Sequence, residues 1–179
     1  MWYIGINNNL WSWFQCYLTN RFQRVSINHW LSDPLPVKSG VPQDSILGPL
    51  FFIIYINDLP ISIRHSRILN FADDTKCYKG IHNALDMASL QLDLNSLTKW
   101  STENQLSFNI NKCAVLQFKS NSTTSESSSY SIDDHPLSNK SYHRDLGIIF
   151  SANLNWSSHY EAIICKAYRS FGLLRRIFL

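Results

Sequence analysis

Hydrophobic residues recur at helical spacing in three parts of the chain. Positions three and four residues apart share one face of an α-helix, so each run predicts an amphipathic helix. We expect the first helix to end near Thr19 and the last to begin near Ser157. The apolar positions are Leu10, Trp13, Phe14, Tyr17 and Leu18; Met87, Leu90, Leu94, Leu97 and Trp100; and Tyr160, Ile163, Ile164, Ala167, Phe171, Leu174 and Phe178.

Other stretches alternate between apolar and polar residues, as half-buried β-strands do. A polar turn is expected at residues 32–34, and a second turn at residues 111–112. The expected strands cover residues 22–27, 106–110, 115–118 and 146–150, together with a hairpin over residues 67–78. Helices and strands in this order predict an α+β fold.

A continuous apolar run covers residues 46–56 and predicts a buried helix. About 20 apolar residues are needed to span a bilayer, so this run is too short for a membrane segment. Asp44 or Ser45 can cap the helix, and Pro49 is tolerated because it falls near the first turn. We expect no membrane association.

Residues 119–141 are rich in serine and predict a flexible or variable surface loop. This loop divides the chain into three expected segments. They are residues 1–118, residues 119–141, and residues 142–179.

The chain has 179 residues, is 45% hydrophobic and carries a net charge of +3, which indicates a globular domain that permits a nucleic-acid partner. Its four cysteines and six histidines lack the spacing of a zinc site or a disulfide framework. We therefore expect reduced thiols in an intracellular protein, in the cytoplasm or nucleus, without a signal peptide or a small-molecule cofactor. The last helix concentrates positive charge at Lys166, Arg169, Arg175 and Arg176. The basic side of this helix is either exposed to solvent or lies along the phosphate backbone of a nucleic acid.

Two adjacent carboxylates, Asp73 and Asp74, stand at the tip of the expected hairpin. At roughly 4 Å and an effective dielectric near 20 their repulsion costs about 4 kcal/mol. A hard divalent cation with oxygen ligands offsets that repulsion directly. The alternative is an ordinary solvated turn, which a second pair, Asp133 and Asp134, also illustrates.

The motifs around Asp73 and Asp74 favour the metal site over the ordinary solvated turn. In order along the chain, they resemble the reverse transcriptases of jockey-like non-LTR retrotransposons. The matching motifs are residues 13–25; Gly40-Val41-Pro42-Gln43 with Ser45, Leu47, Gly48 and Pro49; Asn57-Asp58-Leu59-Pro60; Phe71-Ala72-Asp73-Asp74; Trp100-Ser101 with Leu106, Asn109 and Lys112; and Asp145-Leu146-Gly147-Ile148 with residues 154–159.

The resemblance implies a partial right-hand polymerase palm, an antiparallel sheet backed by helices, followed by a thumb-like helical segment. It implies DNA synthesis on an RNA template from a DNA primer with deoxynucleoside triphosphates, using Mg²⁺ or Mn²⁺. Asp73 would be the bridging metal ligand and Asp74 its supporting carboxylate. The residues implied to contact nucleotide or template are Gly40, Val41, Pro42, Gln43, Phe71 and Lys112, although a lone lysine after a turn is also commonly solvated.

Two departures from the family pattern bear on activity. The family usually has glycine where this chain has Asp44, whose bulk and charge either weaken the site or cap the following helix. The first catalytic aspartate of the family lies upstream of the motifs seen here. Because each 1.36 kcal/mol is tenfold in rate, we expect its absence to cost about a thousandfold or more.

These observations leave two main hypotheses. The chain is either a fragment of an RNA-directed DNA polymerase that is inactive on its own, or a non-enzymatic retroelement remnant that at most binds nucleic acid through its basic last helix. An unrelated domain with a fortuitous Asp-Asp turn is disfavoured by the ordered series of motifs.

Overall fold

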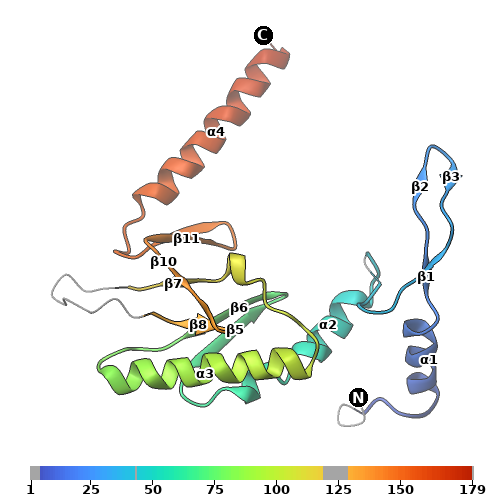
Figure 1. The fold of residues 1–179 in the computed structure, drawn as a ribbon. Helices are drawn as coiled ribbons and strands as arrows, with labels where there is room; N and C mark the ends of the chain where they lie inside the picture. Colours follow the sequence, from blue (N-terminus) through green and yellow to red (C-terminus); the bar gives the residue numbers. More distant parts are fainter. Residues whose placement is uncertain (1–4, 43, 119–128, 179) are drawn as a thin grey trace. The chain divides into compact units, whose positions relative to one another are not determined.

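The computed structural model describes residues 5–42, 44–118 and 129–178 (Figure 1). The chain forms two compact units. The N-terminal unit comprises Met1–Asp58 with Asn70–Thr75, and the C-terminal unit comprises Leu59–Leu69 with Lys76–Leu179. Among the helices in these described ranges, none combines the length and the apolar character that crossing a membrane requires.

Two helices pack through aromatic rings in the N-terminal unit. Helix α1 covers Asn8–Leu18, as the periodicity predicts, and α2 covers Gly48–Ile56 with Pro49 in its first turn. The ring of Phe14 meets that of Phe51 edge-on, with centroids 5.0 Å apart, and both side chains are buried. Tyr17 also lies against Phe51 at 5.9 Å.

Between these helices the chain forms two short antiparallel ribbons. Strand β1 (Phe22–Gln23) pairs with β4 (Leu35–Pro36), and β2 (Ser26–Ile27) pairs with β3 (Trp30–Leu31). The expected continuous strand over residues 22–27 is therefore wrong, and so is the expected turn at residues 32–34. The chain reverses instead at Asn28 and His29, which both have positive φ as a two-residue hairpin turn requires.

The C-terminal unit has its core along one long helix. Helix α3 covers Ala84–Glu103 and buries Leu94, Leu97 and Trp100, as the sequence periodicity predicts. The 3₁₀ helix η2 (Leu59–Ser62) and β8 (Ser131–Ile132) both contact α3. Leu59 is completely buried, and Tyr130 and Ile132 also belong to this core.

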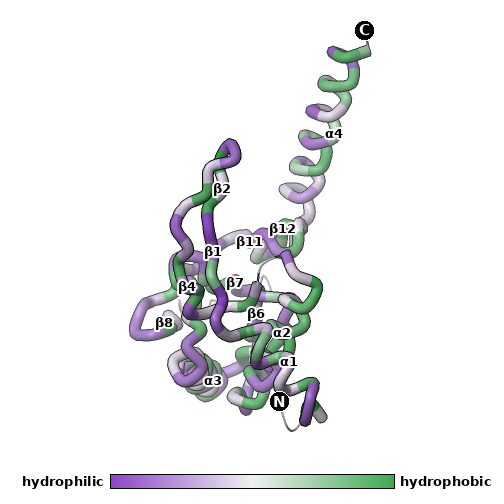
Figure 2. The backbone as a smooth tube through the Cα atoms, turned by 90° about the vertical axis from the view of Figure 1, so that its right-hand side faces the viewer, coloured by the Kyte–Doolittle hydropathy of each residue, from purple (hydrophilic) through white to green (hydrophobic). Residues whose placement is uncertain are grey.

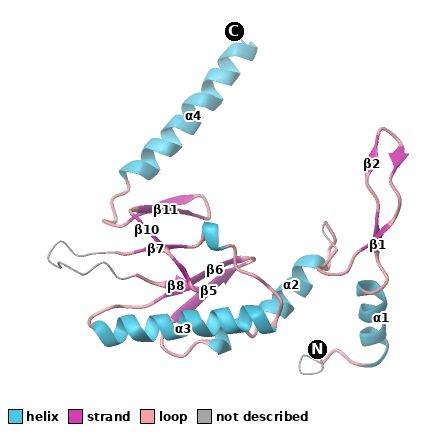
Figure 3. Cartoon of the chain, in the orientation of Figure 1, coloured by secondary structure: helices cyan, strands magenta, loops and turns pink. Residues whose placement is uncertain are grey.

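The described strands form separate two-stranded sheets (Figure 3). The first is the hairpin of β5 (Arg67–Phe71) and β6 (Asp74–Tyr78). Strand β7 (Ala114–Leu116) runs parallel to β10 (Ser138–Lys140), and antiparallel pairs join β8 to β9 (His135–Pro136) and β11 (Tyr142–Asp145) to β12 (Ile148–Ser151).

An α+β fold is thus confirmed, but the described strands do not join into one antiparallel sheet. Strands of two to five residues make few ladder hydrogen bonds, and each of these pairs with one neighbour.

Three further expectations of strand or loop are wrong in whole or in part; the expected strand over residues 146–150 is present only from Ile148. Residues 106–110 form no strand, because Ser101 holds Leu106 through both backbone and side chain and the 3₁₀ helix η3 (Ile110–Lys112) follows. Leu146 and Gly147 form the turn between β11 and β12, with φ of 46° and 87°. Residues 119–128 lie outside the described residues, but residues 129–141 contain three strands instead of a loop.

The chain continues into α4 (Ser157–Phe178), which begins where the sequence predicts. Its residues are exposed except His159, and the described helix buries no side chain. Hydrophilic and hydrophobic positions alternate along its length (Figure 2). The helix is therefore amphipathic along most of its length.

Candidate nucleotidyl-transfer site

The two carboxylates predicted to bind metal occupy different positions in the β5–β6 hairpin. Asp73 is the second residue of the two-residue turn, and Asp74 is the first residue of β6. Ala72, the first turn residue, has φ of 50°, whereas Asp73 does not have a positive φ. Positive φ at the first central residue alone is the pattern of a type II′ turn, where glycine is usual. Alanine there costs about 1–2 kcal/mol.

The second Asp-Asp pair has a different geometry. Asp133 and Asp134 are both central residues of the β8–β9 turn, with φ of 51° and 59°. That is the type I′ pattern, which aspartate commonly adopts. Because Asp73 and Asp74 straddle the end of their turn, the two pairs present their carboxylates differently. The two pairs therefore occupy different positions in their turns, and all four aspartates are exposed.

The second predicted contact region is the segment of residues 40–47, here called the Gly40 loop. Gly40 has φ of 78°, and open space surrounds the position of a Cβ atom, so glycine serves the backbone conformation there. The guanidinium of Arg21 donates to the carbonyl oxygens of Leu18 and Gly40. Arg21 thereby ties the start of the loop to the end of α1.

The other end of the Gly40 loop closes onto α2. The Ser45 hydroxyl donates to the carbonyl oxygen of Pro42 at 2.7 Å and accepts from the backbone N–H of Gly48 at 2.9 Å. The N-cap residue of α2 is Leu47, without a side-chain cap bond, so neither Asp44 nor Ser45 takes the predicted N-cap position; Ser45 instead bonds the first helical N–H from two residues further upstream. Asp44 is exposed and has φ of 55°. Gln43 lies outside the described residues.

The two compact units divide the predicted site residues between them. Gly40, Val41, Pro42, Phe71 and the Asp73–Asp74 pair all belong to the N-terminal unit. Phe71 is the last residue of β5 and is 60% exposed, so its ring is accessible to a ligand. The exposed Lys112 instead ends η3 in the C-terminal unit.

The predicted metal ligands, Asp73 and Asp74, are of the chemical type that a hard divalent ion prefers. Both Asp73 and Asp74 are exposed, and Mg²⁺ prefers carboxylate oxygens while it keeps several waters. Within the described ranges, no three His, Cys, Asp or Glu side chains gather as a metal site. Two carboxylates would supply only part of a six-coordinate shell, and water or triphosphate oxygens would have to supply the rest.

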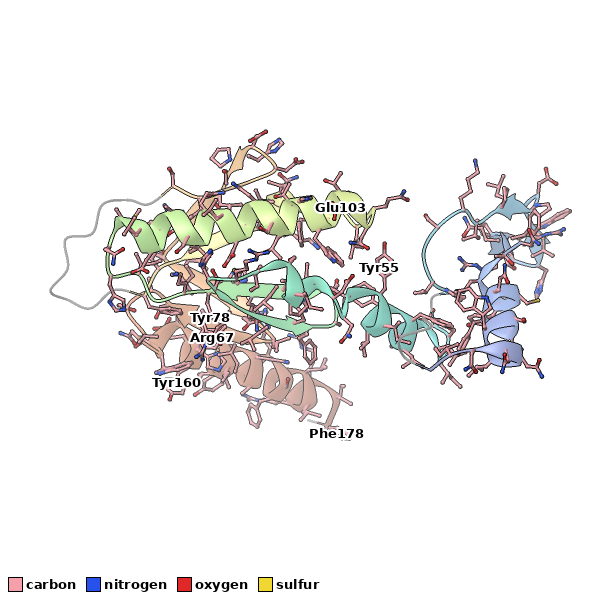
Figure 4. All side chains as sticks on the ribbon, turned by 90° about the horizontal axis from the view of Figure 1, so that it is seen from below. Tyr55, Arg67, Tyr78, Glu103, Tyr160 and Phe178 are labelled. Atoms are coloured by element: carbon pink, nitrogen blue, oxygen red, sulfur yellow. The ribbon has the colours of Figure 1, made fainter. Side chains whose placement is uncertain are left out.

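The four cations of α4 do not share one face. At 3.6 residues per turn, Lys166, Arg169 and Arg176 lie within about a quarter turn of one another, opposite the apolar stripe. Arg175 is about half a turn from Lys166 and borders that stripe. Tyr160 and Phe178, labelled in Figure 4, mark the two ends of the stripe.

Sequence reasoning missed a buried carboxylate next to the hairpin. Asp93 on α3 is only 2% exposed and accepts backbone N–H groups from Arg64, His65 and Ser66 at 3.0, 2.9 and 2.6 Å. Burial alone raises the pKa of Asp93, but the hydrogen bonds from these backbone N–H groups lower that pKa below its ordinary value. The signal was present, since Asp93 interrupts the apolar stripe of α3 between Leu90 and Leu94.

An ion pair joins the second hairpin strand to a motif near the end of the chain. The ammonium of Lys76 on β6 lies 2.5 Å from a carboxylate oxygen of Asp145, the last residue of β11. Both side chains are partly exposed, so the pair contributes about 0–1 kcal/mol. The pair links β6 to the last residue of β11.

Comparison with known proteins identifies the family. The family described as reverse transcriptase (RNA-dependent DNA polymerase) matches residues 3–149. No solved structure matches the chain significantly.

Three similar proteins are named as polymerases of mobile elements in Drosophila melanogaster. The RNA-directed DNA polymerase from mobile element jockey is 26% identical over 151 residues, which are 80% of this chain and 16% of the relative. The probable RNA-directed DNA polymerase from transposon BS is 29% identical over 171 residues, 89% of this chain and 18% of the relative. The corresponding protein of transposon X-element is 25% identical over 89% of this chain and 19% of its own length. The chain thus spans less than a fifth of these relatives, and it belongs to the reverse transcriptase family, as its ordered motifs predict.

Proposed function

We propose that this chain carries part of the nucleotidyl-transfer site of an RNA-directed DNA polymerase from a non-LTR retrotransposon. One observation carries the proposal: the Asp73–Asp74 tip and the Gly40 loop fall in the same compact unit although about 30 residues separate them in sequence. In this reading the β5–β6 hairpin is the catalytic hairpin of a polymerase palm, and α4 begins a thumb-like segment.

Asp73 and Asp74 would hold Mg²⁺, or Mn²⁺ in its place, with Asp73 as the bridging ligand and Asp74 as the supporting carboxylate. The bound ions supply charge stabilisation for the attacking 3′ oxygen and the leaving pyrophosphate. The protein's part is to keep two like charges close together and open to solvent until the cation offsets their repulsion.

The Gly40 loop would form the floor beneath the incoming nucleotide and the template base, through Gly40, Val41, Pro42 and Gln43. Arg21 and Ser45 support this assignment because they fix the loop at both ends, and a fixed loop costs less to order when a ligand binds. Phe71 would lie near the primer end and Lys112 near the triphosphate. The substrates would be an RNA template, a DNA primer and deoxynucleoside triphosphates.

We further propose that the 179 residues alone do not extend a primer. Two adjacent carboxylates supply a minority of the ligands that two six-coordinate ions need, and Asp44 adds a negative charge to the Gly40 loop. Primer extension on an RNA template, with Mg²⁺ and then Mn²⁺, tests this directly. We expect no product; a metal-dependent product that disappears in Asp73→Asn would refute the inactivity and show a complete site. Binding of Mn²⁺ tests the metal ligands without turnover.

A second candidate function is binding of nucleic acid through α4. The specific observation is that Lys166, Arg169 and Arg176 form one exposed basic face opposite the apolar stripe. Such a face can follow a phosphate backbone while the other side of the helix packs. Salt-sensitive binding without synthesis would favour this candidate, which corresponds to a non-enzymatic remnant.

A further inference from the structure

The base of the β5–β6 hairpin is tied to α3 on the side where the chain enters it. Asp93 accepts three consecutive backbone N–H groups, from Arg64, His65 and Ser66. The next residue, Arg67, begins β5 and is labelled in Figure 4. A single carboxylate therefore fixes the backbone immediately before the strand that leads to the hairpin tip.

The side where the chain leaves the hairpin is tied to the same elements. Lys79, one residue after β6, donates from its ammonium to the carbonyl oxygen of His65 at 3.2 Å. The same ammonium lies 3.7 Å from a carboxylate oxygen of Asp86 on α3. Asp86 in turn accepts the backbone N–H of His82 at 2.9 Å. Both ends of the hairpin thus converge on the N-terminal half of α3.

We propose that Asp93 is a positioning residue for the Asp73–Asp74 pair, acting through the segment of residues 64–66 and assisted by Lys79. This inference rests on the proposed function and adds a residue to it. The hairpin strands are five residues each, so a shift at their base is transmitted to the turn that carries the carboxylates. Register matters here because a slip by one residue moves every side chain to the other face.

The chemistry requires a carboxylate at position 93. A carboxylate has two oxygens that accept only, and it satisfies three N–H donors with charge-assisted hydrogen bonds. Asparagine of the same shape would turn an NH₂ group toward N–H donors. At least one buried donor would then lose its partner, and the segment would move to satisfy it. The lowered pKa of Asp93 agrees with a carboxylate held ionised.

Hydrogen–deuterium exchange on the full chain tests the anchoring. We expect Asp93→Asn to speed exchange about tenfold at the amides of residues 64–78, while the amides of α1 and α2 stay unchanged. Lys79→Met is the second variant, because its side chain lies outside the core and the protein should still fold; we expect a smaller effect on the same amides. Asp133→Asn, at an exposed turn, is the matched control. Unchanged exchange at residues 64–78 in both variants would refute the inference.

Mn²⁺ affinity separates positioning from a purely structural role. In conditions where Asp93→Asn remains folded, we expect its Mn²⁺ affinity to fall about tenfold or more although Asp73 and Asp74 are intact. Equal affinity of Asp93→Asn and the wild type would show that Asp93 is only structural and would overturn the inference. Absence of Mn²⁺ binding by the wild type itself would instead refute the proposed metal site, and the inference with it.

Discussion

A Cβ atom on Gly48 would lie 2.8 Å from the carbonyl oxygen of Pro42 and 3.0 Å from the hydroxyl oxygen of Ser45. Real Cβ atoms essentially never approach a backbone oxygen so closely, so glycine at position 48 allows the Gly40 loop to fold back onto α2. The same closeness lets Ser45 bond Pro42 and Gly48 at once. The shape of the Gly40 loop thus depends on the absence of a Cβ atom at Gly48.

We predict that Gly48→Ala destabilises the chain by about 1–3 kcal/mol, the usual cost of overpacking a close contact. Urea unfolding measures the change. Gly172→Ala is the matched control, because Gly172 lies inside α4 with open space around its Cβ position and alanine favours a helix. We expect Gly172→Ala to unfold at the wild-type urea concentration or above it; if Gly48→Ala does the same, the close contact has no energetic role.

Replacing Asp44 by glycine should stabilise the chain. Asp44 has φ of 55°, a region that glycine adopts without steric cost, so we expect a gain of about 0.5–1 kcal/mol. Thermal unfolding gives the comparison. Asp33→Gly is the control, since Asp33 does not have a positive φ and glycine there only adds entropy to the unfolded chain. A loss of stability in Asp44→Gly equal to that of the control would contradict the role of backbone strain.

The lowered pKa of Asp93 predicts acid lability. Because the folded-state pKa lies below the ordinary value of 3.8, ionised Asp93 stabilises the fold above that value. The stabilisation is lost as pH falls through the lower folded-state pKa. Urea unfolding from pH 6 to pH 2 should therefore show a steeper fall in stability for the wild type than for Asp93→Asn. Parallel pH profiles would mean that another carboxylate controls acid unfolding.

The faces of α4 predict unequal effects of its four cations. Neutralising Lys166, Arg169 or Arg176 to alanine should each reduce the salt dependence of nucleic-acid binding by about one unit of slope, because each removes one phosphate contact. Arg175→Ala should change the slope less. Fluorescence anisotropy with a labelled RNA–DNA duplex between about 50 and 200 mM salt measures this. Four equal effects would argue for a diffuse charge and against one binding face.

The helices were predictable because their signal is local. Apolar residues at helical spacing located α1, α3 and α4, and the basic residues of α4 were visible in the sequence. The strands were less predictable, since a two-residue pairing such as β2–β3 leaves too short a pattern to place its turn. Residues 106–110 alternate between apolar and polar side chains, as a strand does. Two hydrogen bonds between Ser101 and Leu106 nevertheless hold Leu106 at the end of α3.

The sequence predicted the residues of the candidate site better than the residues that hold their backbone in place. Asp73, Asp74 and the Gly40 loop stood out by motif. Arg21 and Asp93 bond to backbone atoms. The sequence marks Asp93 as a polar residue within an apolar stripe, but it does not reveal which backbone groups Asp93 binds. The hydrogen bonds that Asp93 accepts from the backbone N–H groups of residues 64–66 span 27 to 29 positions of sequence. Only the fold brings those groups together.

The central claim is that Asp73 and Asp74, and not aspartate pairs in general, bind the divalent ion. Electron paramagnetic resonance titration of Mn²⁺ tests it on four proteins: the wild type, Asp73→Asn, Asp74→Asn, and a control that carries Asp133→Asn with Asp134→Asn. The control is matched because it makes the same Asp→Asn change at the other adjacent aspartate pair, which also lies at a hairpin turn. We predict that the control binds Mn²⁺ like the wild type and that Asp73→Asn and Asp74→Asn lose most of the affinity. Equal binding by all four proteins, or loss in the control instead, would contradict the assignment of the site.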